Sequence, residues 1–168
     1  MSFFVLLFYV FRNFFVSIHI SVIVFNESST LSRITDLFSA RGYNIVSLTV
    51  APIPESKYSR LTIVTSGSSR VIEQIIKQLH KLIPVLKVYE HADLVEKEMA
   101  LIKFPISENI SDIDTLCQAY NGKIVNAGPD MVIAMVADEP KRINHFLEAA
   151  KRFHLKEIVR SGAVALER

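Results

Sequence analysis

The alternation of hydrophobic and polar positions divides the chain into short strands and helices. Residues 17–25 (SIHISVIVF) form an apolar run rich in β-branched residues, which predicts a buried strand. A polar cluster at 26–29 ends this strand, and Gly42 supplies a left-handed stop after the helix that follows. That helix carries its apolar residues on one face, at Leu31, Ile34, Leu37 and Phe38.

The next four elements complete a β-α-β-β-α-β order. Residues 45–51 predict a second strand, closed by Pro52 and Pro54, and residues 59–65 alternate in polarity and predict a third. We expect these two strands to form an antiparallel pair. We expect Ser68 or Ser69 to cap a second helix, and residues 85–89 to form a fourth strand. The buried stripe of the second helix is predicted at Val71, Ile72, Ile75, Ile76 and Leu79.

The same order then repeats about eighty residues later. Its strands are predicted at 98–104, 123–126, 131–137 and 155–166, with a bulge at Gly162, and its helices at 112–120 and from Pro140 onward. The predicted fold class is therefore α+β, with two ferredoxin-like βαββαβ modules whose antiparallel sheets carry helices on one face.

The predicted boundaries are an apolar N-terminal extension at 1–16, a first module at 17–92 and a second module at 93–168. A short charged linker is expected near 92–97. A sheet covered by helices on one face leaves its other face and an edge bare in a single copy. We therefore expect two copies to pair side by side, with a crevice where the loop after the first strand of one meets the other.

Composition narrows the classes of function. The net charge is +2 and the 19 basic residues are spread along the chain, which argues against a nucleic-acid partner. Cys117 is the only cysteine and lies in a helical pattern, so we expect a buried thiol in a protein of the reducing cytoplasm. Residues 1–16 are interrupted by Arg12, and the run is too short for a membrane span and lacks a secretory cleavage site.

The chain has no pattern that indicates catalysis or metal binding. The five histidines are scattered without the spacing of metal ligands, and the glycines stand apart, so no phosphate-binding loop is formed. The third strand, 58–65, also lacks the aromatic platform of an RNA-recognition module. We expect neither a catalytic residue nor a metal site.

The most informative stretch is NESSTLSR, residues 26–33. A strand that runs into a helix N-terminus exposes unpaired N–H groups, which suit the carboxylate of a free amino acid. The alternative is that Ser29 or Thr30 simply caps the helix, which stabilises it by about 1 kcal/mol without any ligand. The residues alone favour neither interpretation.

The runs NESSTLSRITDLFSARGYNIVSLTVAP, YSRLTIVTSG, IIKQLHKLIPVLKV and RSGAVALER resemble the regulatory small subunits of acetolactate synthase, also called acetohydroxyacid synthase. The resemblance implies an N-terminal ACT domain, an ACT-like second domain and a homodimer. It also implies docking on a catalytic large subunit. The small subunit would raise the activity of that partner and would let a branched-chain amino acid, typically valine, inhibit it. Thiamine diphosphate, magnesium and FAD would belong to that catalytic partner, and this chain would hold no cofactor and perform no catalysis by itself.

The resemblance also implies an effector site between two protomers. It would comprise Asn26, Ser29, Thr30 and Leu31 of one protomer and Asn44 and Ile45 of the other. The family usually has glycine where this chain has Ser29, so a narrower pocket and weaker feedback inhibition are expected. Alternatively, both asparagines are turn residues that bond only their own backbone.

A second class of function stays open. The chain would then be a free-standing amino-acid sensor that acts on transcription or on another enzyme. A neighbouring gene for a large thiamine-diphosphate enzyme would distinguish the two.

Overall fold

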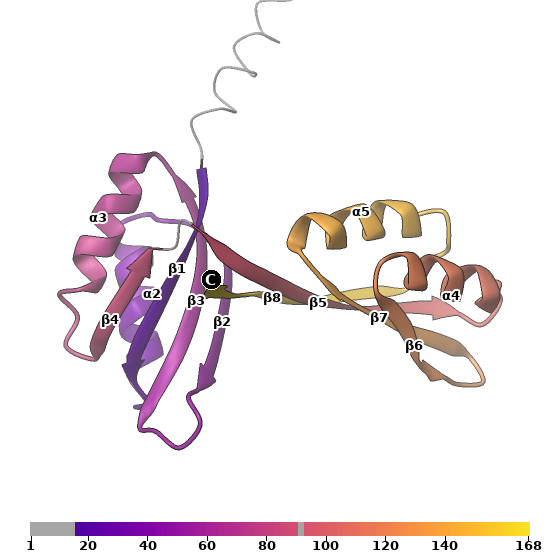
Figure 1. The fold of residues 1–168 in the computed structure, drawn as a ribbon, viewed down its shortest axis with the longest axis horizontal. Helices are drawn as coiled ribbons and strands as arrows, with labels where there is room; N and C mark the ends of the chain where they lie inside the picture. The colour runs from indigo at the N-terminus through magenta and orange to yellow at the C-terminus, as the bar shows by residue number, and fades with distance from the viewer. Residues whose placement is uncertain (1–15, 91–92) are drawn as a thin grey trace, which may run out of the picture. The chain divides into compact units, whose positions relative to one another are not determined.

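The computed structural model describes residues 16–90 and 93–168. They form two compact units, one with strands β1 to β4 and the other with β5 to β8 (Figure 1). The predicted extension, residues 1–16, lies outside the described residues except for Val16, which is the first residue of β1. No helix in the described part of the chain is long and apolar enough to span a membrane.

The first unit has the predicted β-α-β-β-α-β order. Its elements are β1 (Val16–Phe25), α2 (Thr30–Ala40), β2 (Ile45–Pro52), β3 (Tyr58–Gly67), α3 (Ser69–Leu79) and β4 (Val85–Glu90). The strands form one antiparallel sheet in the order β2-β3-β1-β4, and both helices cover the same face of it (Figure 1). The predicted strand pair is thus β2 with β3.

The core of this unit lies between the sheet and its two helices. Ile20 and Val22 of β1 stand opposite Ile63 and Leu61 of β3, and all four are at most 1% exposed. The helices add a matching apolar stripe of Ile34, Phe38, Ile72, Ile75 and Leu79. Every second residue of each central strand therefore points to the helices, as the period of two requires.

The second unit repeats this fold. Its elements are β5 (Leu94–Pro105), α4 (Ile110–Ala119), β6 (Gly122–Ala127), β7 (Met131–Asp138), α5 (Pro140–Ala150) and β8 (Glu157–Glu167). The sheet order is β6-β7-β5-β8, which matches the first sheet position by position. Gly162 has a φ of 78° within β8, at the point where a bulge was predicted. The α+β class with two ferredoxin-like modules is confirmed.

The charged linker predicted near 92–97 is wrong for most of its length. Strand β5 begins at Leu94, and only Ala92 lies outside the described residues. The charge of Lys97 is compatible with a strand because it finds a partner on a neighbouring element. Lys97 pairs with Asp138 of β7, and the next residue, Glu98, pairs with Arg160 of β8.

Candidate functional site

The loop between β1 and α2 is held in place by backbone and side-chain hydrogen bonds. The Asn26 N–H donates to the Lys57 carbonyl at 3.0 Å, and the Thr30 N–H donates to the Glu27 carbonyl at 3.1 Å. The Thr30 hydroxyl, which is buried, donates back to the Phe25 carbonyl at 3.0 Å. The loop is therefore a fixed platform at the start of α2.

The start of α2 is not capped by a side chain, so the predicted cap at Ser29 or Thr30 is wrong. Ser29 occupies the N-cap position without a capping hydrogen bond, because its φ of −95° and ψ of −4° are helical instead of extended. The Thr30 hydroxyl donates its hydrogen bond to the Phe25 carbonyl of the preceding strand and not to the helix. By contrast, the Ser68 hydroxyl accepts from the Val71 N–H at the start of α3.

The first turn of α2 therefore keeps free donors. The N–H groups of Leu31 and Ser32 donate to no other residue in the described part of the chain. Such groups at the positive end of a helix attract a carboxylate. Asn26 and Ser29 are exposed beside them, and Leu31 is 39% exposed, so an anion can approach from solvent. Thr30 is buried and serves to position the loop.

The two asparagines do not behave as self-bonded turn residues. Within residues 16–90 and 93–168, neither Asn26 nor Asn44 makes a side-chain hydrogen bond. Asn44 contributes only its backbone carbonyl, which accepts from the Thr65 hydroxyl at 2.6 Å. Both amides are exposed and can take a polar ligand group.

The structure places the two halves of the predicted site at opposite ends of the first sheet. Phe25, just before the loop, stands opposite Tyr58 of β3, whereas Ile45 stands opposite Thr65 of the same strand. Seven residues of strand separate these positions, or about 24 Å. One copy of the chain cannot bring Asn26 and Asn44 together, so a site built from both requires two copies.

The serine at position 29 costs no backbone strain. Its φ of −95° is ordinary for any L-residue, and the positive-φ positions among the described residues lie elsewhere, at Gly42, Glu55, Asn121 and Gly162. Serine in place of glycine therefore affects the site only through the added bulk of its side chain.

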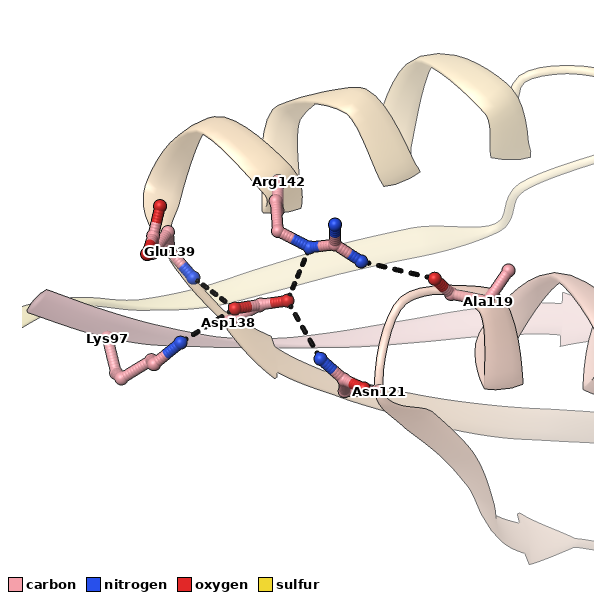
Figure 2. A network of polar contacts seen from close by, with 6 residues as sticks. All are labelled: Lys97, Ala119, Asn121, Asp138, Glu139 and Arg142. Carbon is pink, nitrogen blue, oxygen red and sulfur yellow. Dashed lines mark hydrogen bonds and ion pairs between the residues drawn. The ribbon is translucent and has the colours of Figure 1, made fainter.

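A polar network at the end of β7 is the other conspicuous cluster, and sequence reasoning missed it. The buried Asp138 carboxylate accepts hydrogen bonds from Lys97 at 2.7 Å, Asn121 at 3.1 Å, Arg142 at 2.6 Å and the Glu139 N–H at 2.8 Å. Figure 2 shows these groups around the carboxylate. These bonds, that of Lys97 foremost, hold the pKa of Asp138 well below its usual range. Because the carboxylate is fully occupied, the network stabilises the unit and offers no ligand site.

Beside it, Arg160 binds buried Glu98 through two bonds of 2.5 and 2.7 Å. Glu98 and Asp138 are neighbours in the β5–β7 register, and each carboxylate has its own arginine. The sequence contained a signal for this cluster. Glu98 and Asp138 stand at positions of β5 and β7 whose side chains point to the helices, where a charged residue needs a buried partner.

The remaining reactive groups are a single thiol and scattered titratable side chains. Cys117 is fully buried in α4, and burial raises the pKa of its thiol to about 11, so it stays protonated at neutral pH. Among the residues that the structure describes, no three His, Cys, Asp or Glu side chains are grouped to hold a metal ion.

Comparison with known proteins identifies the family. The family profile described as "AHAS small subunit-like ACT domain" matches residues 20–87, and the profile "Small subunit of acetolactate synthase" matches residues 97–168. The acetolactate synthase small subunit of Aquifex aeolicus is 40% identical over 153 residues, which cover 89% of this chain and 80% of that protein. This chain belongs to the acetolactate synthase small-subunit family.

Two further relatives agree with this assignment. The small subunit of acetolactate synthase isozyme 3 from Escherichia coli is 40% identical over 153 residues, covering 89% of this chain and 94% of that protein. The crystal structure of the acetolactate synthase small subunit from Thermotoga maritima superposes with a TM-score of 0.85 at 32% identity, covering 91% of this chain and 98% of that one. The resemblance seen in the sequence is confirmed. A catalytic large-subunit partner follows from membership in this small-subunit family.

Proposed function

We propose that this chain is the regulatory, non-catalytic subunit of acetolactate synthase in branched-chain amino-acid biosynthesis. It raises the activity of the catalytic large subunit and mediates feedback inhibition by a branched-chain amino acid, most simply valine. The effector lies between the ACT domains of a homodimer, against Asn26, Ser29 and Leu31 of one protomer and Asn44 and Ile45 of the other. Thiamine diphosphate, magnesium and FAD sit on the catalytic subunit, and both subunits work in the cytoplasm.

The observation that carries this proposal is the uncapped first turn of α2. A serine at the N-cap usually satisfies one free N–H, yet here the N–H groups of Leu31 and Ser32 have no partner in the described residues. Together with the exposed amide of Asn26, they present donors for a carboxylate beside a half-exposed leucine. A free apolar amino acid offers the matching groups.

The regulation follows from the separation of the two halves. Since Asn26 and Asn44 lie about 24 Å apart along one sheet, an effector that contacts both must bridge two protomers. Such an effector favours one arrangement of the paired domains, and the catalytic subunit responds to that arrangement. A coupling free energy of about 1–3 kcal/mol between the sites would change activity about 5- to 150-fold.

A free-standing sensor is less well supported than a synthase subunit. The relatives described above are named as small subunits of acetolactate synthase, and they match this chain along both of its units. A sensor that works alone would need no second unit of this family.

The test is complementation between two variants that have each lost valine binding. We expect Asn26→Ala and Asn44→Ala homodimers each to bind valine at least tenfold more weakly, measured by calorimetry. When the two variants are mixed and exchange subunits, about half of the dimers contain one chain of each kind. Each such dimer has one intact site and one doubly altered site, so about one quarter of all sites recover valine binding. Asn126→Ala, an exposed asparagine of the second unit, is the matched control and leaves binding unchanged.

Two results would contradict the proposal. If the unaltered chain does not bind valine at millimolar concentration, valine is not its effector. If both variants lose binding but their mixture recovers none, the site is not shared between protomers.

A further inference from the structure

The backbone carbonyl of Asn44 is held by a threonine of a neighbouring strand. Thr65 of β3 is fully buried, and its hydroxyl donates to the Asn44 carbonyl at 2.6 Å. The register places Thr65 between Ile18 of β1 and Ile45 of β2, so the hydroxyl lies in an otherwise apolar row. Valine is β-branched like threonine and would fill the same space, so packing alone does not require a hydroxyl here. What threonine adds is the bond to Asn44.

The turn that carries Asn44 is also anchored on its other side, at the end of α2. Gly42 has a φ of 65°, which ends the helix, and the Tyr43 N–H donates to the Phe38 carbonyl at 2.9 Å. The Tyr43 ring packs edge-on against the Phe38 ring, with the centroids 6.1 Å apart. Because a peptide group is planar, the Thr65 bond fixes the peptide plane after Asn44 and so restrains the direction of the Asn44 side chain.

The other half of the candidate site has a buried threonine in the same role. Thr30 is 4% exposed, and its hydroxyl donates to the Phe25 carbonyl at 3.0 Å, just before Asn26. Each predicted asparagine therefore stands beside a backbone carbonyl that accepts from a buried threonine hydroxyl. Both amides are exposed, while the groups that hold their backbone are not.

We infer that Thr65 is a positioning residue of the effector site. Its hydroxyl holds the Asn44 amide of one protomer in the orientation that meets an amino acid bound at Asn26 of the other. A group that is held in place before binding loses less conformational entropy on binding, so the bond raises affinity although Thr65 does not contact the ligand. This inference rests on the proposed function and deepens it.

Removing only the hydroxyl tests the role of Thr65. Thr65→Val should lower the affinity of the full chain for valine, measured by calorimetry, about three- to tenfold, the factor that one hydrogen bond of ordinary strength represents. Thr65→Ser keeps the hydroxyl and should restore most of the affinity. Thr115→Val is the matched control. It removes a hydroxyl bond of 2.8 Å to the Ser111 carbonyl in the second unit and leaves valine affinity unchanged.

Subunit mixing separates positioning from a general loss of stability. Thr65→Val damages only the half of the site that contains Asn44. Its mixture with Asn26→Ala therefore contains dimers with one intact site, and about one quarter of all sites regain full affinity. Its mixture with Asn44→Ala has the same half damaged in both chains and regains none. A variant that only folds less well would behave alike with both partners.

Three results would overturn the inference. They are unchanged valine affinity in Thr65→Val, a loss that Thr65→Ser does not restore, and equal recovery with Asn26→Ala and Asn44→Ala. None of these results contradicts the proposed function as long as Asn26→Ala and Asn44→Ala complement each other. If those two variants fail to complement, the shared site is refuted and the inference falls with it.

Discussion

Replacing Asp138 by alanine should destabilise the second unit by about 3 kcal/mol. The carboxylate is 3% exposed and accepts four hydrogen bonds, from Lys97, Asn121, Glu139 and Arg142. Breaking a buried ion pair by removing one partner costs about 3–5 kcal/mol. Because the side chains of Lys97 and Arg142 are 49% and 47% exposed, both cations can rehydrate, which places the cost at the low end.

The assay can report on this unit alone. The chain has no tryptophan, and Cys117 is its only cysteine, fully buried in α4. Labelling of that thiol by a disulfide reagent requires the second unit to open, so 3 kcal/mol corresponds to labelling about a hundredfold faster. The control is Glu157→Ala, which breaks the exposed pair with Lys103 and leaves the labelling rate unchanged.

The pH dependence gives an internal check of the cause. The folded pKa of Asp138 lies below its unfolded value, so its contribution is complete above the unfolded pKa and is lost as pH falls toward the folded one. The chain and the Asp138→Ala variant should therefore differ most at neutral pH and converge below about pH 4. A difference in labelling that is absent at pH 7, or equally large at pH 7 and pH 3, would refute the reasoning.

Three further predictions concern single positions. Ser29→Gly should bind valine more tightly in calorimetry, because it removes bulk beside the free N–H groups; equal or weaker binding would show that the hydroxyl contributes. Gly122→Ala should lower the free energy of unfolding by about 1–3 kcal/mol, because its Cβ would lie 2.6 Å from Val136 Cγ2, whereas Gly128→Ala meets nothing closer than 3.6 Å and should be neutral in urea denaturation. The native Cys117 thiol, with its pKa raised to about 11, should resist alkylation at pH 8 and react at once in urea, and rapid native labelling would contradict its burial.

Periodicity predicted the fold because both sheets obey it. The buried parity of β1 and β3, with Ile20 and Val22 facing the helices, is readable as a run of β-branched residues. The prediction from the sequence pattern was wrong at 94–97, where charged residues suggested a linker and the structure has the start of β5. Within that segment Lys97 is accommodated in the strand by its pair with Asp138, which lies 41 positions away in sequence.

The residues of the candidate site stay a prediction, and the conformation and hydrogen bonds of those residues could not be predicted from the sequence. Ser29 and Thr30 both favour a capped helix from sequence alone, since a hydroxyl before a helix usually bonds the first turn. Whether it does so depends on the backbone angles of Ser29 and on the bond from Thr30 to Phe25, which are set by tertiary structure. The separation of Asn26 from Asn44 likewise required the strand register.

The central claim is that this chain both activates a catalytic subunit and makes it sensitive to a branched-chain amino acid. The most direct test is the rate of acetolactate formation by the cognate large subunit, with and without this chain, across a valine titration. We predict stimulation by the chain and its reversal by valine, with the reversal lost in Asn26→Ala while stimulation remains. Absence of any stimulation would contradict the account.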